Sequence, residues 1–469
     1  MINQSNSSLK SFGKLKLKLL LTALAITSPF VSVGEIISSE QVIKDITYLA
    51  ADELKGRASF SPELDQAANY IAKRFAEIGL KPMQSNGSAS QATSNTTGFL
   101  QTFSVNQIQP QYLSVKLNNI DIRRENLAIA TTMAQVNWQL GKAQNHIIDK
   151  DDDMRKVLGE LNQQGGQHLV IINSAHSKMF QGYQSYFEGG LTKLSPLHQS
   201  AIVMVLSDET ELNTYRVSAR AKITKRVLTN VVGVLPGHEN ANEIILYSAH
   251  YDHLGTTTDG KQIYNGADDD ASGTTAVINL AQYYAKQGNN KRTLMFSAFT
   301  AEEIGGFGSK YFSKQLNPDD VVAMINIEMI GKPSKFGAGT VWMTGMERSN
   351  LGALLNDKLN ENLGNKNNEK SSALSSQIYQ DPYPEQGLFY RSDNATLARL
   401  GVPAHSFSST QLDQDQHYHQ VSDDLNSLNL SSMHKVIEAL AIATQALVDG
   451  TVTPTRIEQE QVRSQGKIY

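Results

Sequence analysis

Cysteine is absent from all 469 residues of this chain. The protein therefore has no disulfide bond, no thiolate metal ligand and no cysteine nucleophile, and it cannot be anchored to a membrane through a lipidated cysteine. Any metal site has to be built from imidazole nitrogens and carboxylate oxygens. Stability must come from a packed core, and we expect bound metal ions to add to it.

A strong net charge of either sign is also lacking. The 42 basic and 46 acidic residues give a net charge of −4, which provides no electrostatic basis for binding nucleic acid or an anionic membrane. Hydrophobic residues make up 40% of the chain, enough for a substantial core. The length exceeds that of one ordinary domain, so we expect one large domain with an insertion or satellite.

Long apolar runs are lacking outside the amino terminus. Several lysines precede a short apolar run from Leu19 to Ile26, and small residues follow it. This pattern predicts a signal peptide over residues 1–34 and an exported protein, periplasmic or extracellular. The run is much shorter than the roughly 20 residues of a membrane-spanning helix, so no stable membrane anchor is expected after cleavage.

Hydrophobic periodicity divides the rest of the chain. Helices are predicted from Ser38 to Leu54 and from Ser61 to Gly79, and a loop rich in small polar residues from Ser85 to Thr97. Short β-like runs then predict an inserted module. The predicted segments after the signal peptide are an amino-terminal helical part (35–112), the inserted module (113–226), the core (227–450) and a carboxy-terminal tail (451–469).

Within the core, apolar runs alternate with helical patterns. This alternation predicts an α/β fold with a mixed, largely parallel central sheet and helices on both faces. The predicted strands cover 228–235, 243–248, 293–299, 321–327 and 402–407, and the predicted helices cover 273–284, 308–316, 393–400 and 433–447. A polar, irregular loop is expected over 365–380. Ligands of such sheets bind at the carboxyl ends of the strands.

Acidic and histidine residues gather where the predicted strands end. Their clusters are His250–Asp252, Asp268–Asp270, Glu302–Glu303, Glu328 and a late loop, His417–His419. Such donors suit one or two divalent ions of the zinc type. A two-metal hydrolytic site needs a carboxylate that bridges two ions roughly 3.5–4 Å apart, terminal ligands and a separate base. Of the neighbours Glu302 and Glu303, one can bind metal while the other accepts a proton.

These motifs resemble the co-catalytic zinc aminopeptidase family, which groups secreted bacterial leucine aminopeptidases with glutamate carboxypeptidases and, more distantly, glutaminyl cyclases. The resemblance covers about Val227 to Asp424, with a weaker echo at Leu54–Arg57. It implies that residues 227–450 form a zinc peptidase core. The module at 113–226 occupies the place of a protease-associated insert in many relatives.

The resemblance also implies roles for single residues. His250 matches the histidine of the His-x-Asp motif, with Asp252 as the carboxylate that holds its ring, and Asp269 matches the bridging aspartate of Asp-x-x-Ser-Gly. Glu302 matches the general base. One Zn²⁺ ion would then take His250, Asp269 and Glu328, and a second Zn²⁺ ion would take Asp269, Glu303 and His419. Tyr418 matches a tyrosine that steadies the oxyanion in similar enzymes.

The sequence departs from the family pattern at two places. Relatives commonly carry aspartate where this chain has Glu328, and Ser-Asp-His where it has Ser392-Asp393-Asn394. The second departure leaves Arg391 as a candidate substrate contact. Two acidic residues are expected to be turn-formers and three histidines to be surface or packing residues: Asp268, Asp270, His253, His405 and His417.

The function expected from the sequence is that of an exported zinc aminopeptidase acting on peptides, with Glu302 as general base. A carboxypeptidase or a glutaminyl cyclase of the same fold is the alternative, although a cyclase normally binds one zinc ion and this chain keeps all five ligand positions. A non-catalytic, receptor-like relative is the alternative from another class. Such relatives lose the base or the ligands, whereas Glu302 and Glu303 are both present.

Overall fold

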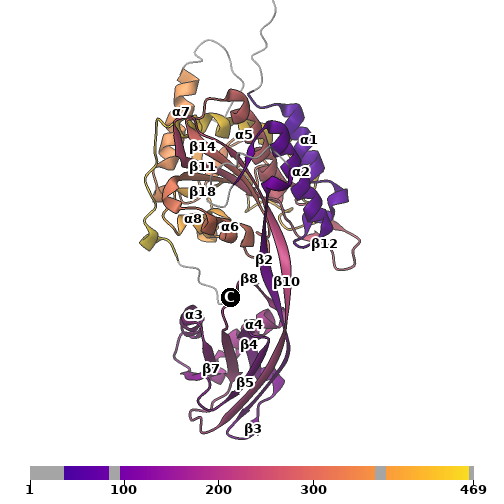
Figure 1. The fold of residues 1–469 in the computed structure, drawn as a ribbon, viewed down its shortest axis with the longest axis vertical. Helices are drawn as coiled ribbons and strands as arrows, with labels where there is room; N and C mark the ends of the chain where they lie inside the picture. Colours follow the sequence, from indigo (N-terminus) through magenta and orange to yellow (C-terminus); the bar gives the residue numbers. More distant parts are fainter. Residues whose placement is uncertain (1–35, 84–95, 365–376, 464–469) are drawn as a thin grey trace, which may run out of the picture. The chain divides into compact units, whose positions relative to one another are not determined.

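The computed structural model describes residues 36–83, 96–364 and 377–463 (Figure 1). The predicted signal peptide and most of the predicted loop from Ser85 to Thr97 lie outside these residues. From Ile36 onward the chain forms one compact unit. In the described part of the chain, no helix has both the length and the apolar character needed to cross a bilayer.

Two amino-terminal helices begin at the positions that their caps predict. The side chain of Ser38 caps α1 (Ser39–Leu49), and that of Ser61 caps α2 (Pro62–Ile78), which ends at Gly79 with φ +90°. The prediction that the first helix reaches Leu54 was wrong. The helix ends at Leu49, Ala51 is extended (φ −71°, ψ 147°), and a short 3₁₀ segment follows over Asp52–Arg57, where Gly56 adopts φ +68° against a main-chain oxygen of Tyr264.

The central sheet is mixed, as predicted, and its middle is parallel. Four strands run parallel in the order β14-β11-β15-β18, and β10 pairs antiparallel with β14 and with β2. The bounds are β2 (Leu100–Leu117), β10 (Tyr215–Leu235), β11 (Asn240–His250), β14 (Arg292–Phe299), β15 (Val321–Ile327) and β18 (Ala404–Ser408). Beyond β18 lie β16 (Val341–Met343) and β17 (Ile378–Gln380). Residues 365–376 of the predicted loop lie outside the described residues, and the prediction was wrong at its end, where Ile378–Gln380 form β17.

Helices cover both faces of this sheet because its central strands are apolar on both sides. Along β11, Ile245 and Tyr247 pack on one face with α1, α2, α5 (Gly273–Gln287) and α9 (Leu430–Ala443). Leu246 faces the other side, with α6 (Phe307–Phe312) and α8 (Asn394–Ala398). This alternation fixes which residues can reach the strand ends.

Residues 118–214, here called the small-sheet module, form a second sheet with the strand order β4-β9-β7-β6. This sheet and its helices comprise β4 (Leu127–Thr131), β6 (Gln144–Ile148), α3 (Met154–Gln164), β7 (Gln167–Ile172), α4 (Ser177–Glu188) and β9 (Ala201–Leu206). Three further strands of the same range pair with β2 or β10 instead: β3 (Ile120–Asp121), β5 (Gln135–Gln139) and β8 (Leu191–Leu194). The long strands β2 and β10 pair from Leu100 opposite Val231 to Leu117 opposite Tyr215. They therefore run continuously across both predicted edges of the inserted module, at 113 and 226.

Candidate metal centre

Three neighbouring parallel strands deliver side chains to one edge of the central sheet. His250 is the last residue of β11, Glu302 and Glu303 follow β14 closely, and Glu328 comes directly after β15. The strand register sets His250 beside Phe299 at the ends of β11 and β14. The carboxyl ends of parallel strands meet in one crevice, so the clusters predicted from the sequence come together there.

Asp269 reaches the same crevice from the turn that precedes α5. Its backbone N–H and that of Asp268 both donate to the Asp423 carboxylate, at 3.1 Å. A Cβ on Gly273 would lie 2.1 Å from the carbonyl oxygen of Ile327. Only glycine therefore allows the start of α5 to pack this closely against β15, and this packing holds Asp269 over the strand ends.

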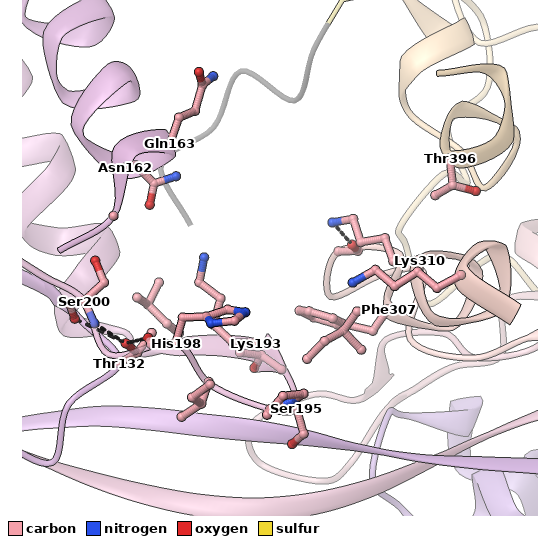
Figure 2. Close-up of a pocket in the computed structure, with 18 of the residues that line it drawn as sticks. Thr132, Asn162, Gln163, Lys193, Ser195, His198, Ser200, Phe307, Lys310 and Thr396 are labelled. Carbon is pink, nitrogen blue, oxygen red and sulfur yellow. Dashed lines mark hydrogen bonds between the residues drawn. The ribbon is translucent and has the colours of Figure 1, made fainter. Parts of the chain in front are cut away.

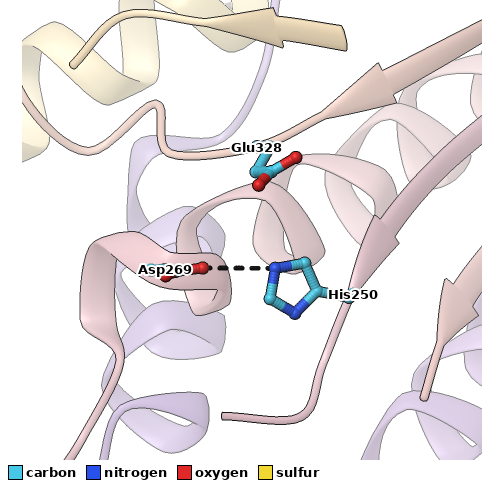
Figure 3. Close-up of side chains that lie close together, drawn as sticks. All are labelled: His250, Asp269 and Glu328. Atoms are coloured by element: carbon cyan, nitrogen blue, oxygen red, sulfur yellow. Dashed lines mark ion pairs between the residues drawn. The ribbon is translucent and has the colours of Figure 1, made fainter. Parts of the chain in front are cut away.

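The first donor group comprises His250, Asp269 and Glu328, whose ligand atoms lie within 4.8 Å of one another (Figure 3). His250 Nε2 is 3.2 Å from Asp269 Oδ1. The other ring nitrogen, Nδ1, lies 3.1 Å from the carbonyl oxygen of Asp252 and 3.7 Å from its carboxylate. With Nδ1 as the protonated nitrogen, the lone pair of Nε2 points toward the two carboxylates.

The second donor group comprises His253, Asp269 and Glu303, and His419 joins it. His253 Nδ1 lies 2.7 Å from Glu303 Oε1, and His419 Nε2 lies 3.2 Å from Asp269 Oδ2 and 3.3 Å from Glu303 Oε2. Asp269 thus belongs to both groups, as a bridging residue must. The sequence missed the proximity of His253, although its position three residues after His250 in the same turn is a signal for it.

These donor groups fit a divalent ion. Within the two donor groups, four buried atoms lack a hydrogen bond of good geometry: His250 Nε2, both ring nitrogens of His253, and Glu303 Oε1. Burying such groups without partners costs free energy, which a bound cation offsets. Two ligands bound about 2.0–2.1 Å from one tetrahedral ion lie roughly 3.3 Å apart. The distances of 3.2 and 3.3 Å among His250, Asp269, Glu303 and His419 match that spacing.

Protonation in the cluster is set by burial and by neighbouring charges. Burial raises the pKa of Glu328 to about 7, and it raises the pKa of Glu302 well above its usual range, helped by the charges of Glu328 and Asp393. Burial opposes the charge of Asp269, but contacts with His250 and His419 hold its pKa well below the usual value. Contacts with Asp269 and Glu303 raise the pKa of His419 to about 10. The carboxylates of Asp269 and Glu303 thus stabilise a positive charge beside them, that of the His419 imidazolium, and a metal cation would be stabilised in the same way.

A pocket of about 110 Å³ opens onto the metal centre. Carboxylates of the site form part of its walls. The other lining side chains are apolar and polar, and they include Met329, Trp342, Leu388, Arg391, Leu412 and Tyr418. The guanidinium of Arg391 donates to the hydroxyl oxygen of Tyr418, at 3.3 Å. Arg391, the candidate substrate contact, and Tyr418, the residue matched to an oxyanion donor, thus both line the pocket.

Apart from His253, the residues expected to be structural lie around the centre rather than in it. Asp270 accepts N–H groups of His250, Gly273 and Met329, and Asp268 accepts that of Gly331. His405 is buried between Thr344 and Ser349, and Asn394 donates to main-chain carbonyls. His417 bonds to Ser422 in the late loop. These side chains hold the turns that carry the donors.

A larger cavity, of about 1570 Å³, lies away from the metal centre (Figure 2). Residues of the small-sheet module, including Lys193 and His198, line it together with Phe307, Lys310 and Thr396 of the core. Burial and the charge of Lys310 lower the pKa of Lys193 to about 8. None of the described residues that line this cavity is an aspartate or glutamate, so it offers no carboxylate ligand for a metal ion.

Comparison with known proteins places the donor residues in a matched region. Residues 230–444 match the model of Peptidase family M28. The chain is 32% identical over 236 residues to a probable zinc metalloprotease of Pyrenophora teres f. teres (strain 0-1), covering 46% of this chain and 47% of the relative. It is 28% identical over 218 residues to a probable leucine aminopeptidase of Arthroderma otae, covering 44% and 53%. The match thus spans about half the length of these curated relatives.

Among solved structures, the fold is similar to that of a zinc aminopeptidase from Bacillus subtilis. The TM-score is 0.52 at 14% sequence identity, and the alignment covers 91% of this chain and 99% of the other. At this identity the likeness concerns the fold alone. It supports the α/β architecture predicted from the alternating strands and helices.

Proposed function

We propose that the protein is a zinc-dependent aminopeptidase that removes amino-terminal residues from peptides, with residues 230–444, which match peptidase family M28, as its catalytic part. One observation carries the proposal. Two donor groups share Asp269, while Glu302 lines the same pocket and belongs to neither group. A two-metal hydrolase needs this division between carboxylates that bind metal and one that moves a proton.

The centre would hold two Zn²⁺ ions. His250, Asp269 and Glu328 would bind one, and Asp269, Glu303 and His419 would bind the other. When bound, the ions supply positive charge that lowers the pKa of a water molecule and polarises the scissile carbonyl. The orphaned nitrogen of His250 and oxygen of Glu303 support this assignment.

Glu302 is the proposed general base. Its backbone N–H donates to Asp252 Oδ1, at 3.0 Å, and this bond fixes the start of the turn that carries its side chain. Glu302 accepts the proton of the attacking water and passes it to the leaving amine. Because burial and nearby carboxylates raise the pKa of Glu302, its carboxyl group holds that proton more readily than an exposed glutamate would.

Tyr418 is the proposed donor to the oxyanion. Its oxygen accepts a hydrogen bond from Arg391, so its own hydrogen remains free to donate toward the pocket. A hydroxyl aimed at the developing charge stabilises the transition state more than the ground state. Arg391 therefore acts on the reaction by orienting Tyr418.

The size and charge of the pocket support amino-terminal specificity. A volume of about 110 Å³ suits a single side chain rather than an extended peptide, and Met329, Trp342 and Leu412 supply apolar wall. Glu302 also lines the pocket and belongs to neither donor group, so one carboxyl group remains to accept a hydrogen bond from the ammonium group of a peptide's first residue.

Hydrolysis of matched chromogenic substrates tests the proposal. An amino-acyl anilide should be cleaved, its amino-acetylated form should not, and a chelator should abolish cleavage until Zn²⁺ is restored. Release of residues from the carboxyl end would indicate a carboxypeptidase instead, and cyclisation of an amino-terminal glutamine would indicate a cyclase. If the zinc-loaded protein turned over none of these substrates, the result would favour the alternative that the protein is a non-catalytic, receptor-like relative.

We also propose that the protein is exported. The lysines before the apolar run from Leu19 to Ile26 support this, because they match the charged and apolar parts of a signal peptide. Amino-terminal sequencing of the protein from the expressing cells should find a start near residue 35. A mature protein that still carries Leu19 would contradict export by cleavage.

A further inference from the structure

His253 is buried beside the donor atoms of the metal centre, and the proposed function gives it no role. It lies in the turn after β11, one residue beyond Asp252, and its side chain is only 2% exposed. Both ring nitrogens are buried, Nε2 has no hydrogen-bond partner, and Nδ1 lies against the carboxylate of Glu303, at 2.7 Å. A neutral imidazole donates from one nitrogen and accepts at the other, so one ring nitrogen still requires a partner.

The ring of His253 faces the donor atoms of the second group. Its Nδ1 lies 2.7 Å from Glu303 Oε1 and 4.0 Å from Asp269 Oδ2. The ring of His419 approaches the same two carboxylates, and the centroids of the two imidazoles are 5.8 Å apart. Glu303 therefore lies between two imidazoles, with one oxygen facing each.

The backbone around His253 is built to hold the ring in this place. Its N–H donates to the carbonyl of Arg57, whose buried guanidinium donates in turn to the carbonyls of Tyr251 and Gly266. A Cβ on Gly266 would lie 2.5 Å from Cγ of the His253 ring. A glycine at this position is therefore what admits the imidazole, so the ring is a positioned group rather than one that fills space.

We propose that His253 is a ligand of the ion held by Asp269, Glu303 and His419. The inference rests on the two-ion centre of the proposed function and adds a residue to it. One ion would then have a single imidazole ligand, from His250, and the other would have two. Because imidazole favours zinc, copper and nickel over magnesium, calcium and manganese, the second position would be the more selective of the two.

The competing reading is that His253 only donates a hydrogen bond that orients Glu303. Glutamine separates the two readings because its amide can donate to Glu303 but is a poor zinc ligand. His253→Gln should therefore resemble His253→Ala if the ring binds metal, and wild type if the ring only orients Glu303. His168→Gln is the matched control, since His168 is a buried histidine of the small-sheet module with both nitrogens bonded.

The test is a zinc titration of the metal-free full-length protein against a chromophoric chelator. Loss of a residue that only orients a ligand weakens metal binding about 10–100-fold. Loss of a ligand should reach or exceed the upper end of that range. We expect His253→Ala and His253→Gln each to weaken one of the two zinc sites at least about 100-fold, with His168→Gln within about threefold of wild type.

Two results would overturn the assignment. One is a His253→Gln protein that binds both ions within about tenfold of wild type, which would make His253 an orienting residue. The other comes from X-ray absorption of the wild-type protein with two zinc ions, and it needs no variant to fold. Three imidazoles for every two ions support the proposal, and two imidazoles exclude it. A wild-type protein that binds one ion would instead refute the two-ion centre itself.

Discussion

The central sheet and the sheet of the small-sheet module both contain three neighbouring parallel strands, but they differ in what their polar groups face. In the small-sheet module, β6, β7 and β9 run parallel, as β14, β11 and β15 do in the central sheet. The buried His168 of β7 has partners for both nitrogens, His146 at 3.1 Å and the carbonyl of Gly165 at 2.7 Å. At the carboxyl edge of the module, Asp208 is exposed and accepts the N–H of Ser174.

At the carboxyl edge of the central sheet, the buried polar atoms are not satisfied in this way. Buried nitrogens of His250 and His253 have no hydrogen-bond partner and face carboxylates instead. Parallel strands and terminal acids occur in both sheets, so neither feature by itself indicates chemistry. What separates the two edges is burial of donor atoms that only a cation can satisfy.

The sharpest test of this comparison removes one carboxylate from each region. Glu302→Gln should lower kcat by about 10²–10⁴-fold, because an amide cannot accept the proton of water. Its zinc content should be unchanged. Glu188→Gln, at an exposed position on α4, should leave both quantities as in wild type. Steady-state kinetics with metal analysis measures this, and equal effects of the two variants would remove the distinction between the regions.

Metal affinity gives the next largest effect. Glu328→Ala should weaken zinc at the His250 group by about 100-fold while the group with Glu303 and His419 keeps its ion. Glu328→Asp should be milder, since it keeps the carboxylate and changes only its reach. Asp208→Ala is the control at the edge of the small sheet. Two zinc ions bound to Glu328→Ala with wild-type affinity would exclude Glu328 from the centre.

The pH dependence of stability tests the effect of burial on a histidine outside the carboxylate cluster, His405. Burial lowers the pKa of His405 to about 4, whereas an unfolded histidine titrates near 6.5. The unfolded state therefore gains a proton first as the pH falls. The contribution of His405 to stability is complete above pH 6.5 and falls by roughly 3 kcal/mol on the way down to pH 4.

Urea unfolding of the metal-free protein between pH 7.5 and 4.5 measures this contribution. Replacing His405 with glutamine should flatten the pH dependence of the free energy of unfolding. His176→Gln, at a partly exposed position in the small-sheet module, is the control and should leave that dependence as in wild type. An unchanged slope in His405→Gln would show that other groups carry the acid sensitivity.

The smallest expected effect concerns Tyr418. Tyr418→Phe should lower kcat about tenfold with little change in KM, because the lost hydroxyl acts only on the oxyanion and bound ions share that task. Tyr183→Phe on α4 should change neither constant. A rise in KM at constant kcat would instead make Tyr418 a residue that binds the ground state.

Much of the fold could be predicted because its signals are local. Apolar runs ending in His250 or Glu328 mark buried parallel strands, and the ends of such strands meet at one edge. The cap at Ser61 and the stop at Gly79 likewise need only neighbouring residues. The sequence therefore predicted which donors converge before any contact between them was known.

The misses depended on contacts between distant residues. A histidine in a turn is ordinarily solvated, and the local pattern around His253 does not reveal that Gly266 leaves room for its ring. After the first helix ends at Leu49, the 3₁₀ segment that includes Gly56 packs against the backbone of Gly255 and Tyr264, which lie about 200 residues further along the chain. The strand β17 forms by pairing with β16, and the hydrophobic periodicity of either segment does not indicate this pairing.

Because β2 pairs with β10 along its whole length, the small-sheet module could be removed without changing the path of the chain elsewhere. Its removal would, however, expose apolar side chains of these two strands to water. Leu117 pairs with Tyr215, so a two-residue hairpin turn could replace everything between them without changing the chain path elsewhere. The ladder's inner face would then meet water, because Val115, Val217 and Ala219 are buried in the core of the module. A shortened protein made by such excision would need polar residues on that face, and a foreign domain grafted there would have to cover it.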